Sequence, residues 1–196
     1  MTEHYFSEKP TSPLKYITIP IEIDGKMYEF TTASGVFSYS KLDRGTQLLV
    51  EAMQLKKTDE FLDLGCGWGF IGIYAARKVK KATLIDINER AIVLAKKNVK
   101  QNKVKNCEVL KSNGFKKLQE RKFDVIAMNP PTHAGKELIL DLVEASYEHL
   151  KKGGRFYFVS KTKLGAKKYG EFIGEVFKNI KVVSLGSGYR VFLAIK

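Results

Sequence analysis

Two hydrophobic patterns alternate along the chain from about residue 46 onward. Short apolar runs bounded by glycine, proline or asparagine are typical of buried parallel strands, whereas apolar residues spaced three or four apart are typical of helices packed on a sheet. The short runs predict strands over residues 61–64, 82–86, 107–110, 123–128 and 155–160. The helical spacing predicts one helix that begins near residue 71 and others over residues 46–53, 89–102, 137–150 and 166–177.

A β-hairpin is predicted at each end of this series. Residues 17–31 alternate between apolar and polar around Asp24-Gly25, a dipeptide that favours the tight turn of a hairpin. We expect this first hairpin to cover one end of the sheet. Residues 180–185 and 189–195 flank Gly186-Ser187-Gly188 and predict a second, antiparallel hairpin at the end of the chain.

Capping signals set several helix boundaries. Residues 35–40 read as a loop, and side chains between Asp43 and Thr46 can cap the helix that follows. Asn88 can cap the helix over 89–102 in the same way. Lys151-Lys152 followed by two glycines is expected to end the helix over 137–150.

These elements together predict the fold class. It is α/β, with an open, doubly wound, mostly parallel seven-stranded sheet that ends in an antiparallel hairpin, preceded by a small N-terminal β-hairpin. The 196 residues suit one globular unit with an ordinary core. Within it we expect residues 1–45 to form the hairpin and a cap segment, and residues 46–196 to form the main domain.

Composition excludes several classes of protein. No run is apolar enough to span a membrane, and the first residues lack the pattern of a signal peptide. Cys66 and Cys107 give neither a disulfide framework nor the spacing of metal ligands, so we expect no metal and no membrane association. A cytoplasmic protein is the simplest expectation.

The net charge of +13 favours a polyanionic partner. With 34 basic residues against 21 acidic ones, pairing of lysine with glutamate does not absorb the surplus, and nucleic acid is favoured over a merely lysine-rich soluble surface. Lysines that follow predicted strands should lie on the rim that carries the site, and those that precede a strand should face the opposite rim. The first group is Lys111, Lys116, Lys117, Lys161 and Lys163, and the second is Lys78, Lys80 and Lys81.

A glycine-rich turn after the first strand predicts a cofactor site. Gly65, Gly67 and Gly69 follow that strand, and Asp86 ends the next one, where an acid that binds ribose hydroxyls is expected. Gly-Trp-Gly-Phe-Ile-Gly also satisfies the dinucleotide fingerprint, and a turn without ligand is the plainer alternative. Asp63, inside the strand, suits a cationic amino group better than a pyrophosphate.

Asn129-Pro130-Pro131 directly follows the predicted strand over 123–128. An amine conjugated to a base or a carbonyl is a poor nucleophile because its lone pair is delocalised. The Asn129 side-chain oxygen and the Pro130 carbonyl can accept hydrogen bonds from the two N–H groups of such an amine. These hydrogen bonds would localise the lone pair and aim it at an electrophilic methyl group. The prolines would hold these acceptors still. The alternative is a proline turn that merely ends the strand.

The glycine turn, the acid and the closing antiparallel strand resemble the class I S-adenosylmethionine (SAM) methyltransferases, from about Thr46 to the end of the chain. The resemblance implies that Asp63 and the three glycines hold the methionine part of SAM. It implies that Asp86 holds the ribose hydroxyls and that Asn113, after the third strand, faces the adenine ring. Trp68 is expected beside the cofactor or in the core.

Two segments are similar to the small-subunit ribosomal RNA guanine methyltransferases that act on the 2-amino group. They are Asn-Pro-Pro-Thr-His-Ala-Gly at 129–135 and Ser-Gly-Val-Phe-Ser-Tyr-Ser-Lys-Leu-Asp-Arg-Gly-Thr-Gln-Leu-Leu at 34–49. Thr132 departs from the family, which has an aromatic residue there to stack on the flipped base, and the longer bacterial members carry an additional N-terminal domain. Phe37 or Tyr39 can supply a substitute face, and the alternative for Phe37 is burial against the end of the sheet. His133 can contact base or phosphate, and the alternative is a solvated loop histidine.

The sequence therefore predicts a SAM-dependent methyltransferase that acts on an exocyclic base amine of RNA, with guanine in ribosomal RNA favoured. Methylation of an adenine 6-amine or of a protein glutamine uses the same acceptor geometry and is the alternative. A dehydrogenase has no use for the Asn-Pro-Pro segment, and a non-catalytic RNA-binding protein has no chemical reason to keep Asp63, Asp86 and Asn129 together. The oligomeric state stays open.

Overall fold

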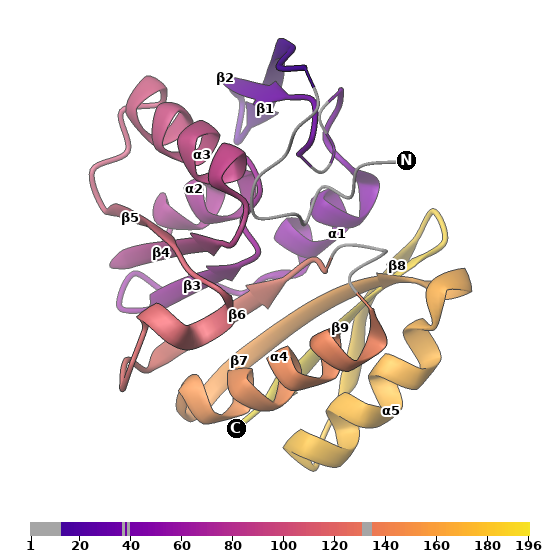
Figure 1. The fold of residues 1–196 in the computed structure, drawn as a ribbon. Helices are drawn as coiled ribbons and strands as arrows, with labels where there is room; N and C mark the ends of the chain where they lie inside the picture. Colours follow the sequence, from indigo (N-terminus) through magenta and orange to yellow (C-terminus); the bar gives the residue numbers. More distant parts are fainter. Residues whose placement is uncertain (1–12, 37, 39, 131–134) are drawn as a thin grey trace.

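The computed structural model describes residues 13–196 except 37, 39 and 131–134. Its main feature is a seven-stranded sheet in the order β5-β4-β3-β6-β7-β9-β8 (Figure 1). The neighbours from β5 to β7 are parallel, and β9 is antiparallel to both of its neighbours. The strands are β3 (Glu60–Leu64), β4 (Lys81–Asp86), β5 (Cys107–Lys111), β6 (Phe123–Met128), β7 (Leu150–Lys161), β8 (Lys181–Gly186) and β9 (Tyr189–Ile195).

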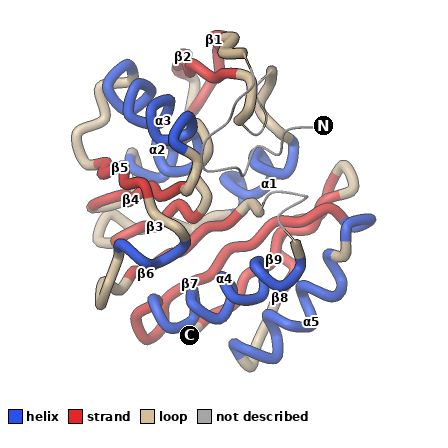
Figure 2. The backbone as a smooth tube through the Cα atoms, in the orientation of Figure 1, coloured by secondary structure: helices blue, strands red, loops and turns tan. Residues whose placement is uncertain are grey.

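Helices cover both faces of the sheet, as Figure 2 shows. Alternate residues of a strand point to opposite faces, so Phe61 and Val125 belong to one hydrophobic cluster and Leu62 and Ile126 to the other. The predicted doubly wound sheet is therefore confirmed. The first face carries α1 (Arg44–Ala52), α2 (Phe70–Ala76) and α3 (Glu89–Gln101), and the second carries α4 (Lys136–His149) and α5 (Ala166–Phe177).

The predicted N-terminal hairpin is present as β1 (Tyr16–Ile23) and β2 (Lys26–Ala33). Asp24 and Gly25 have φ of 49° and 74°, the left-handed conformations that a tight hairpin turn requires. The hairpin does not lie on an end of the sheet, as the sequence analysis expected, but packs on α3. Asn98 of that helix accepts from the backbone N–H of Thr31 and donates to its carbonyl, and buried polar backbone groups demand such partners.

The division of the chain at residues 45 and 46 stays a prediction. Ile23 and Phe30 of the hairpin are buried in the same hydrophobic cluster as Leu49 of α1 and Phe61 of the sheet. The hairpin and the sheet thus share one core. Among the described residues, no helix is long and apolar enough to cross a membrane.

The predicted end of the helix over 137–150, at Lys151-Lys152 and the two glycines that follow, is wrong in detail. Helix α4 ends at His149, and β7 begins at once with Leu150 rather than at Arg155. The register shows why, because Phe123 of β6 faces Leu150 while Val125 faces Arg155, so the residues between them bulge out of the strand. The backbone of this bulge stays paired, with Gly153 N–H donating to the Lys196 carbonyl.

Candidate active site

A pocket opens at the carboxyl ends of the central strands, where the strand order reverses between β3 and β6. It is lined by the turns after β3, β4, β5 and β6, by residues just before α1 and by the first turns of α4. The lining includes Val36, Ser38, Thr46, Gly65, Cys66, Gly67, Trp68, Asp86, Ile87, Ser112, Asn113, Met128, Asn129, Pro130, Leu138 and Leu142. Six of the residues that the sequence analysis proposed for the site are in this lining: Gly65, Gly67, Asp86, Asn113, Asn129 and Pro130.

The three glycines of the turn have different roles. Gly65, Gly67 and Gly69 all have positive φ, at 77°, 54° and 91°. Gly65 and Gly67 line the pocket, and a Cβ on Gly65 would meet nothing within 4 Å, so its backbone is open to a ligand. Gly69 does not line the pocket and instead begins α2, where a Cβ would lie 3.1 Å from the Ala95 Cβ. Its small size serves the packing of α2 against α3.

Asp63 lies behind this turn and does not line the pocket. Its side chain is fully buried, and Oδ2 accepts from the Gly72 N–H of α2 at 2.8 Å. Oδ1 has no hydrogen-bond partner in the part of the chain that the structure describes. Burial, opposed by that hydrogen bond and reinforced by the nearby Asp86 charge, raises the pKa of Asp63 from 3.8 to about 7. Its observed role is to tie the start of α2 to β3.

Asp86 and Asn113 both line the pocket, as the predicted ribose and adenine sites require. Asp86 accepts from the Gly67 N–H at 2.8 Å and from the Asn88 N–H at 2.9 Å, so its carboxylate also shapes the glycine turn. Burial raises the pKa of Asp86 above its ordinary value, although these backbone hydrogen bonds oppose the shift. Each carboxylate oxygen can accept more than one hydrogen bond, so lone pairs remain for a ligand.

Asn129 and Pro130 line the same pocket from the end of β6. The Asn129 Nδ2 donates to Thr46 Oγ1 at 2.9 Å and to Asp43 Oδ2 at 3.3 Å. Oδ1 has no hydrogen-bond partner among the described residues. The amide nitrogen is thus held by the N-terminus of α1, and the oxygen is the atom left for a substrate.

Sequence reasoning missed the residues that hold Asn129. Asp43 was expected only as a helix cap, and it does cap α1 by accepting from the Thr46 N–H. Its Oδ1 also accepts from the Tyr189 hydroxyl at 2.7 Å. A Cβ on Gly45 would lie 2.6 Å from the Tyr189 ring, so glycine is required for this approach. The Leu-Asp-Arg-Gly-Thr run at 42–46 was the signal, but its partners lie more than eighty residues away.

Several predicted residues lie outside the described part of the chain. These are Phe37, Tyr39, Pro131, Thr132 and His133. Their proposed roles stay predictions.

Trp68 was expected beside the cofactor or in the core. It lines the pocket, and its ring also packs edge-on against Phe30 at 5.3 Å.

The cysteines are poorly suited to nucleophilic chemistry. Burial raises the pKa of Cys66 well above its ordinary value and that of Cys107 to about 12. No three histidine, cysteine or acidic side chains in the described chain are grouped as metal ligands.

The pocket suits a cofactor that combines a nucleoside with a charged amino acid. An acid and an amide stand at the ends of adjacent strands, apolar Ile87 and Leu142 flank that region, and backbone at Gly65 is open to close approach. Asp63 keeps an unpartnered, buried oxygen directly behind the turn. The donor set therefore fits SAM.

Comparison with known proteins shows the family. The methyltransferase small domain model matches residues 27–193. YbxB of Bacillus subtilis (strain 168), described as uncharacterized, is 36% identical over the full length of both chains. The Psychromonas ingrahamii protein named ribosomal RNA small subunit methyltransferase C is 31% identical over 91% of this chain and 51% of its own. The chain thus spans about half the length of that curated relative.

A solved structure agrees. The Thermus thermophilus 16S rRNA N2 G1207 methyltransferase (RsmC), in complex with AdoMet and guanosine, superposes with a TM-score of 0.84 at 28% identity, covering 95% of this chain and 52% of that one. The predicted class I methyltransferase fold is confirmed. The chain belongs to the methyltransferase small domain family, and the prediction of a SAM-dependent methyltransferase is borne out at that level.

Proposed function

We propose that this methyltransferase transfers the methyl group of SAM to an exocyclic base amine of RNA, and that its target is the 2-amino group of guanine in ribosomal RNA. One observation carries the proposal. Asn129 and Pro130 line the same pocket as Gly65, Gly67, Asp86 and Asn113, so an acceptor for an amine adjoins the site that fits the cofactor.

We propose separate roles for five of the predicted cofactor residues, namely Asp63, Gly65, Gly67, Asp86 and Asn113. Gly65 and Gly67 give the methionine part of SAM access to the backbone, while Asp63 fixes the turn from behind. Asp86 and Asn113 line the pocket, where Asp86 would accept from the ribose hydroxyls and Asn113 would face the adenine edge. SAM supplies a methyl group made electrophilic by its sulfonium.

The acceptor half activates the amine without a strong base. The Asn129 Oδ1 and the Pro130 carbonyl would accept hydrogen bonds from the two N–H groups of the amine, which localises its lone pair and directs it at the methyl group. As the N–C bond forms the C–S bond breaks, so that S-adenosylhomocysteine is left, and the methylated amine loses one N–H proton to water. Pro130 is buried, its ring fixes φ, and the proline that follows it in the sequence restricts its ψ, so its carbonyl is expected to keep its position through the reaction. We extend the same stiffening role to Pro131.

The choice of guanine in ribosomal RNA rests on the relatives. The protein that superposes on nearly all of this chain is named for N2 methylation of a 16S rRNA guanine and holds guanosine in its complex. The curated relatives from Psychromonas ingrahamii and Escherichia coli are likewise named as ribosomal RNA methyltransferases. Phe37, Thr132 and His133 stay proposed contacts for the base or its phosphates.

Charge on the pocket rim supports an RNA partner. Lys116, Lys117, Lys161 and Lys163 are exposed, and the ion pairs between described residues include none of them. On the opposite rim, Lys78, Lys80 and Lys81 each lie within 4 Å of an acidic oxygen. Lys111 departs from its group, because it pairs with Glu89 at 2.7 Å.

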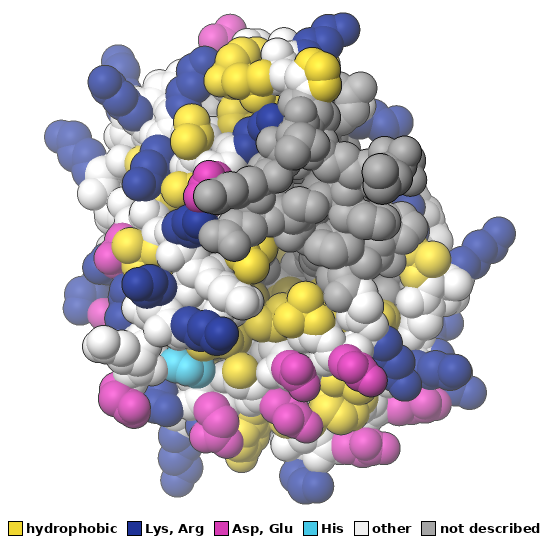
Figure 3. All heavy atoms as spheres, viewed as in Figure 1, with side chains coloured by type: hydrophobic (Ala, Val, Ile, Leu, Met, Phe, Trp, Pro, Cys, Tyr) yellow, Lys and Arg dark blue, Asp and Glu magenta, His cyan; other side chains and the backbone are white. Residues whose placement is uncertain are grey.

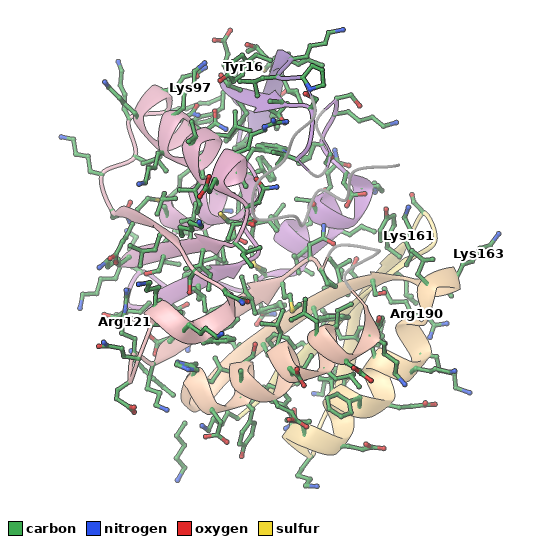
Figure 4. The ribbon with its side chains drawn as sticks, in the orientation of Figure 1. Tyr16, Lys97, Arg121, Lys161, Lys163 and Arg190 are labelled. Carbon is green, nitrogen blue, oxygen red and sulfur yellow. The ribbon has the colours of Figure 1, made fainter. Side chains whose placement is uncertain are left out.

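Arg190, which sequence reasoning missed, lies near the same end of β7 and β9, but its place on β9 puts it on the face of the sheet opposite to Tyr189 and Lys161. It lies in register with Ser160, next to the pair of Lys161 and Tyr189, and Figure 4 shows Lys161, Lys163 and Arg190 on the same side of the molecule. The acidic side chains seen in Figure 3 gather instead over α4 and α5. Phosphates are therefore expected at the β7–β9 end of the pocket rim.

The test is methyl transfer from labelled SAM to RNA from cells that lack this protein, followed by nucleoside analysis. The wild type should yield labelled 2-methylguanosine, and Asn129→Ala should abolish it while SAM still binds. A control variant, Lys105→Gln, changes an exposed lysine before β5, at the edge of the sheet away from the pocket, and should leave transfer intact. Label in 6-methyladenosine or in protein glutamine would move the assignment to those acceptors, and SAM binding without any transfer would refute it.

A further inference from the structure

The amide group of Asn129 can be held in two orientations that differ only in which atom faces the pocket. Activation of an amine requires the oxygen there, because the amide NH₂ would meet the N–H bonds of the substrate as a second donor. Rotation of the amide by half a turn leaves its shape almost unchanged. Packing alone therefore cannot select the active orientation, and a polar partner must do so.

Asp43 provides that selection. A carboxylate offers only acceptors, so the atom of Asn129 that lies 3.3 Å from Asp43 Oδ2 must be the NH₂ nitrogen. In the rotated form two acceptor oxygens would stand at that distance. Thr46 agrees with this choice, because its hydroxyl faces the same Asp43 oxygen at 3.4 Å and so presents a lone pair to Asn129 at 2.9 Å.

Thr46 by itself would not decide the matter. A hydroxyl both donates and accepts, and its proton can rotate to suit either orientation of the amide. With Asp43 removed, Thr46 would accept from Nδ2 or donate to Oδ1 equally well. The selectivity of the network thus comes from the carboxylate.

Asp43 is itself held from the other end of the chain. The Tyr189 hydroxyl donates to Asp43 Oδ1 at 2.7 Å, and the missing side chain of Gly45 makes room for the Tyr189 ring. Lys161 lies over the same ring, with Nζ 5.4 Å from its centroid. Three elements, namely the start of α1, the end of β6 and the start of β9, therefore converge on one carboxylate.

We propose that Asp43 is a positioning residue that fixes the Asn129 amide with its oxygen toward the substrate amine, and that Tyr189 keeps the carboxylate in place for this role. The proposal rests on the methyltransferase function proposed above. It adds a determinant of turnover that neither touches the cofactor nor contacts the transferred methyl group.

The sharpest variant is Asp43→Ser, because it separates positioning from helix capping. Serine still accepts from the Thr46 N–H and keeps the cap of α1, but its short side chain reaches neither Asn129 nor Tyr189. We expect kcat to fall by about tenfold to a hundredfold, since misplacement of a reacting group has effects of that size. The Kd for SAM should stay within about twofold of the wild type, because the cofactor half of the pocket is unchanged.

A spectroscopic measurement reports on the amide directly and needs no substrate. The side-chain NH₂ signals of Asn129 in a ¹H–¹⁵N spectrum are assigned by their loss in Asn129→Ala. They should shift and broaden in Asp43→Ser as the amide samples both orientations. Tyr189→Phe removes a single hydroxyl and should cause a smaller shift and a smaller loss of kcat. Tyr147→Phe, on α4 and packed on Phe177, is the matched control and should change neither.

The outcomes separate the two proposals. An Asp43→Ser enzyme with wild-type kcat, or with unaltered Asn129 NH₂ signals, would overturn the positioning role. If Asp43→Ser loses kcat because it unfolds, its backbone spectrum will be altered. In that case the test passes to Tyr189→Phe: unperturbed Asn129 NH₂ signals in the folded Tyr189→Phe variant would also count against the positioning role. If the wild type fails to methylate RNA while the amide signals still respond to Asp43→Ser, the positioning role stands and the RNA substrate is wrong.

Discussion

Asp63 makes the stability of this protein depend on pH in a direction opposite to that of most carboxylates. Burial without a compensating cation raises its pKa from 3.8 to about 7 in the folded protein. Below the unfolded pKa the carboxyl is protonated in both states and has no effect. As the pH rises toward 7 the unfolded chain releases this proton first, so the unfolded state is increasingly favoured.

The size of the effect follows from the shift. A raise of about three units corresponds to roughly 4 kcal/mol of destabilisation at high pH, and about 2.6 kcal/mol of it develops between pH 5 and pH 8. Above pH 8 the loss is nearly constant because the carboxyl is ionised in both states. Asn in place of Asp63 removes the titration and still offers an oxygen to the Gly72 N–H.

The assay is urea unfolding of the wild type and of Asp63→Asn at pH 5, 6, 7 and 8. The free energy of unfolding of the variant minus that of the wild type should become more positive by about 2–3 kcal/mol across this range. Subtraction cancels every other group that titrates alike in both proteins. A difference that stays flat, or that falls with pH, would refute the reasoning and would mean that the folded protein pairs this carboxylate after all.

Three further predictions follow from packing, burial and charge. Gly72→Ala should lower the free energy of unfolding by about 1–3 kcal/mol in urea, because its Cβ would lie 2.4 Å from the Leu84 Cγ, and unchanged stability would contradict that packing. Asn98→Ala should lower the free energy of unfolding by about 2–4 kcal/mol, because it leaves backbone groups of β2 and of the glycine turn unpaired. Calorimetric titration should also show weaker SAM binding. A variant of full stability would mean that these backbone groups find other partners. Lys161→Gln combined with Lys163→Gln should weaken RNA binding and make the slope of log K against log salt shallower by about 1–2. A matched pair of lysine changes at the opposite rim should have neither effect. Equal effects of the two pairs would refute the assignment of RNA contact to Lys161 and Lys163.

Local pattern was sufficient for most of the fold because the buried faces of strands and helices repeat with short periods. Strand β6 was predicted with its observed bounds, as were α5 and β9, and Asn88 caps α3 as expected. The bulge in β7 was missed because it depends on pairing of Gly153 and Gly154 with Lys196, a contact with no local signal. The hairpin was misplaced for the same reason, since its anchor is Asn98 on α3.

The sequence by itself determined which groups meet at this edge of the sheet: a glycine turn, an acid after the second strand and an Asn-Pro pair after the fourth. Parallel strands present their carboxyl ends at one edge, so residues that follow them meet there without further information. Tertiary structure alone decided that Asp63 stands behind the turn, that Asp43 and Thr46 hold the Asn129 amide and that Tyr189 holds Asp43. These residues come from separate segments of the chain, and the orientation of an amide depends on which atoms face it, a property that exists only once the chain has folded.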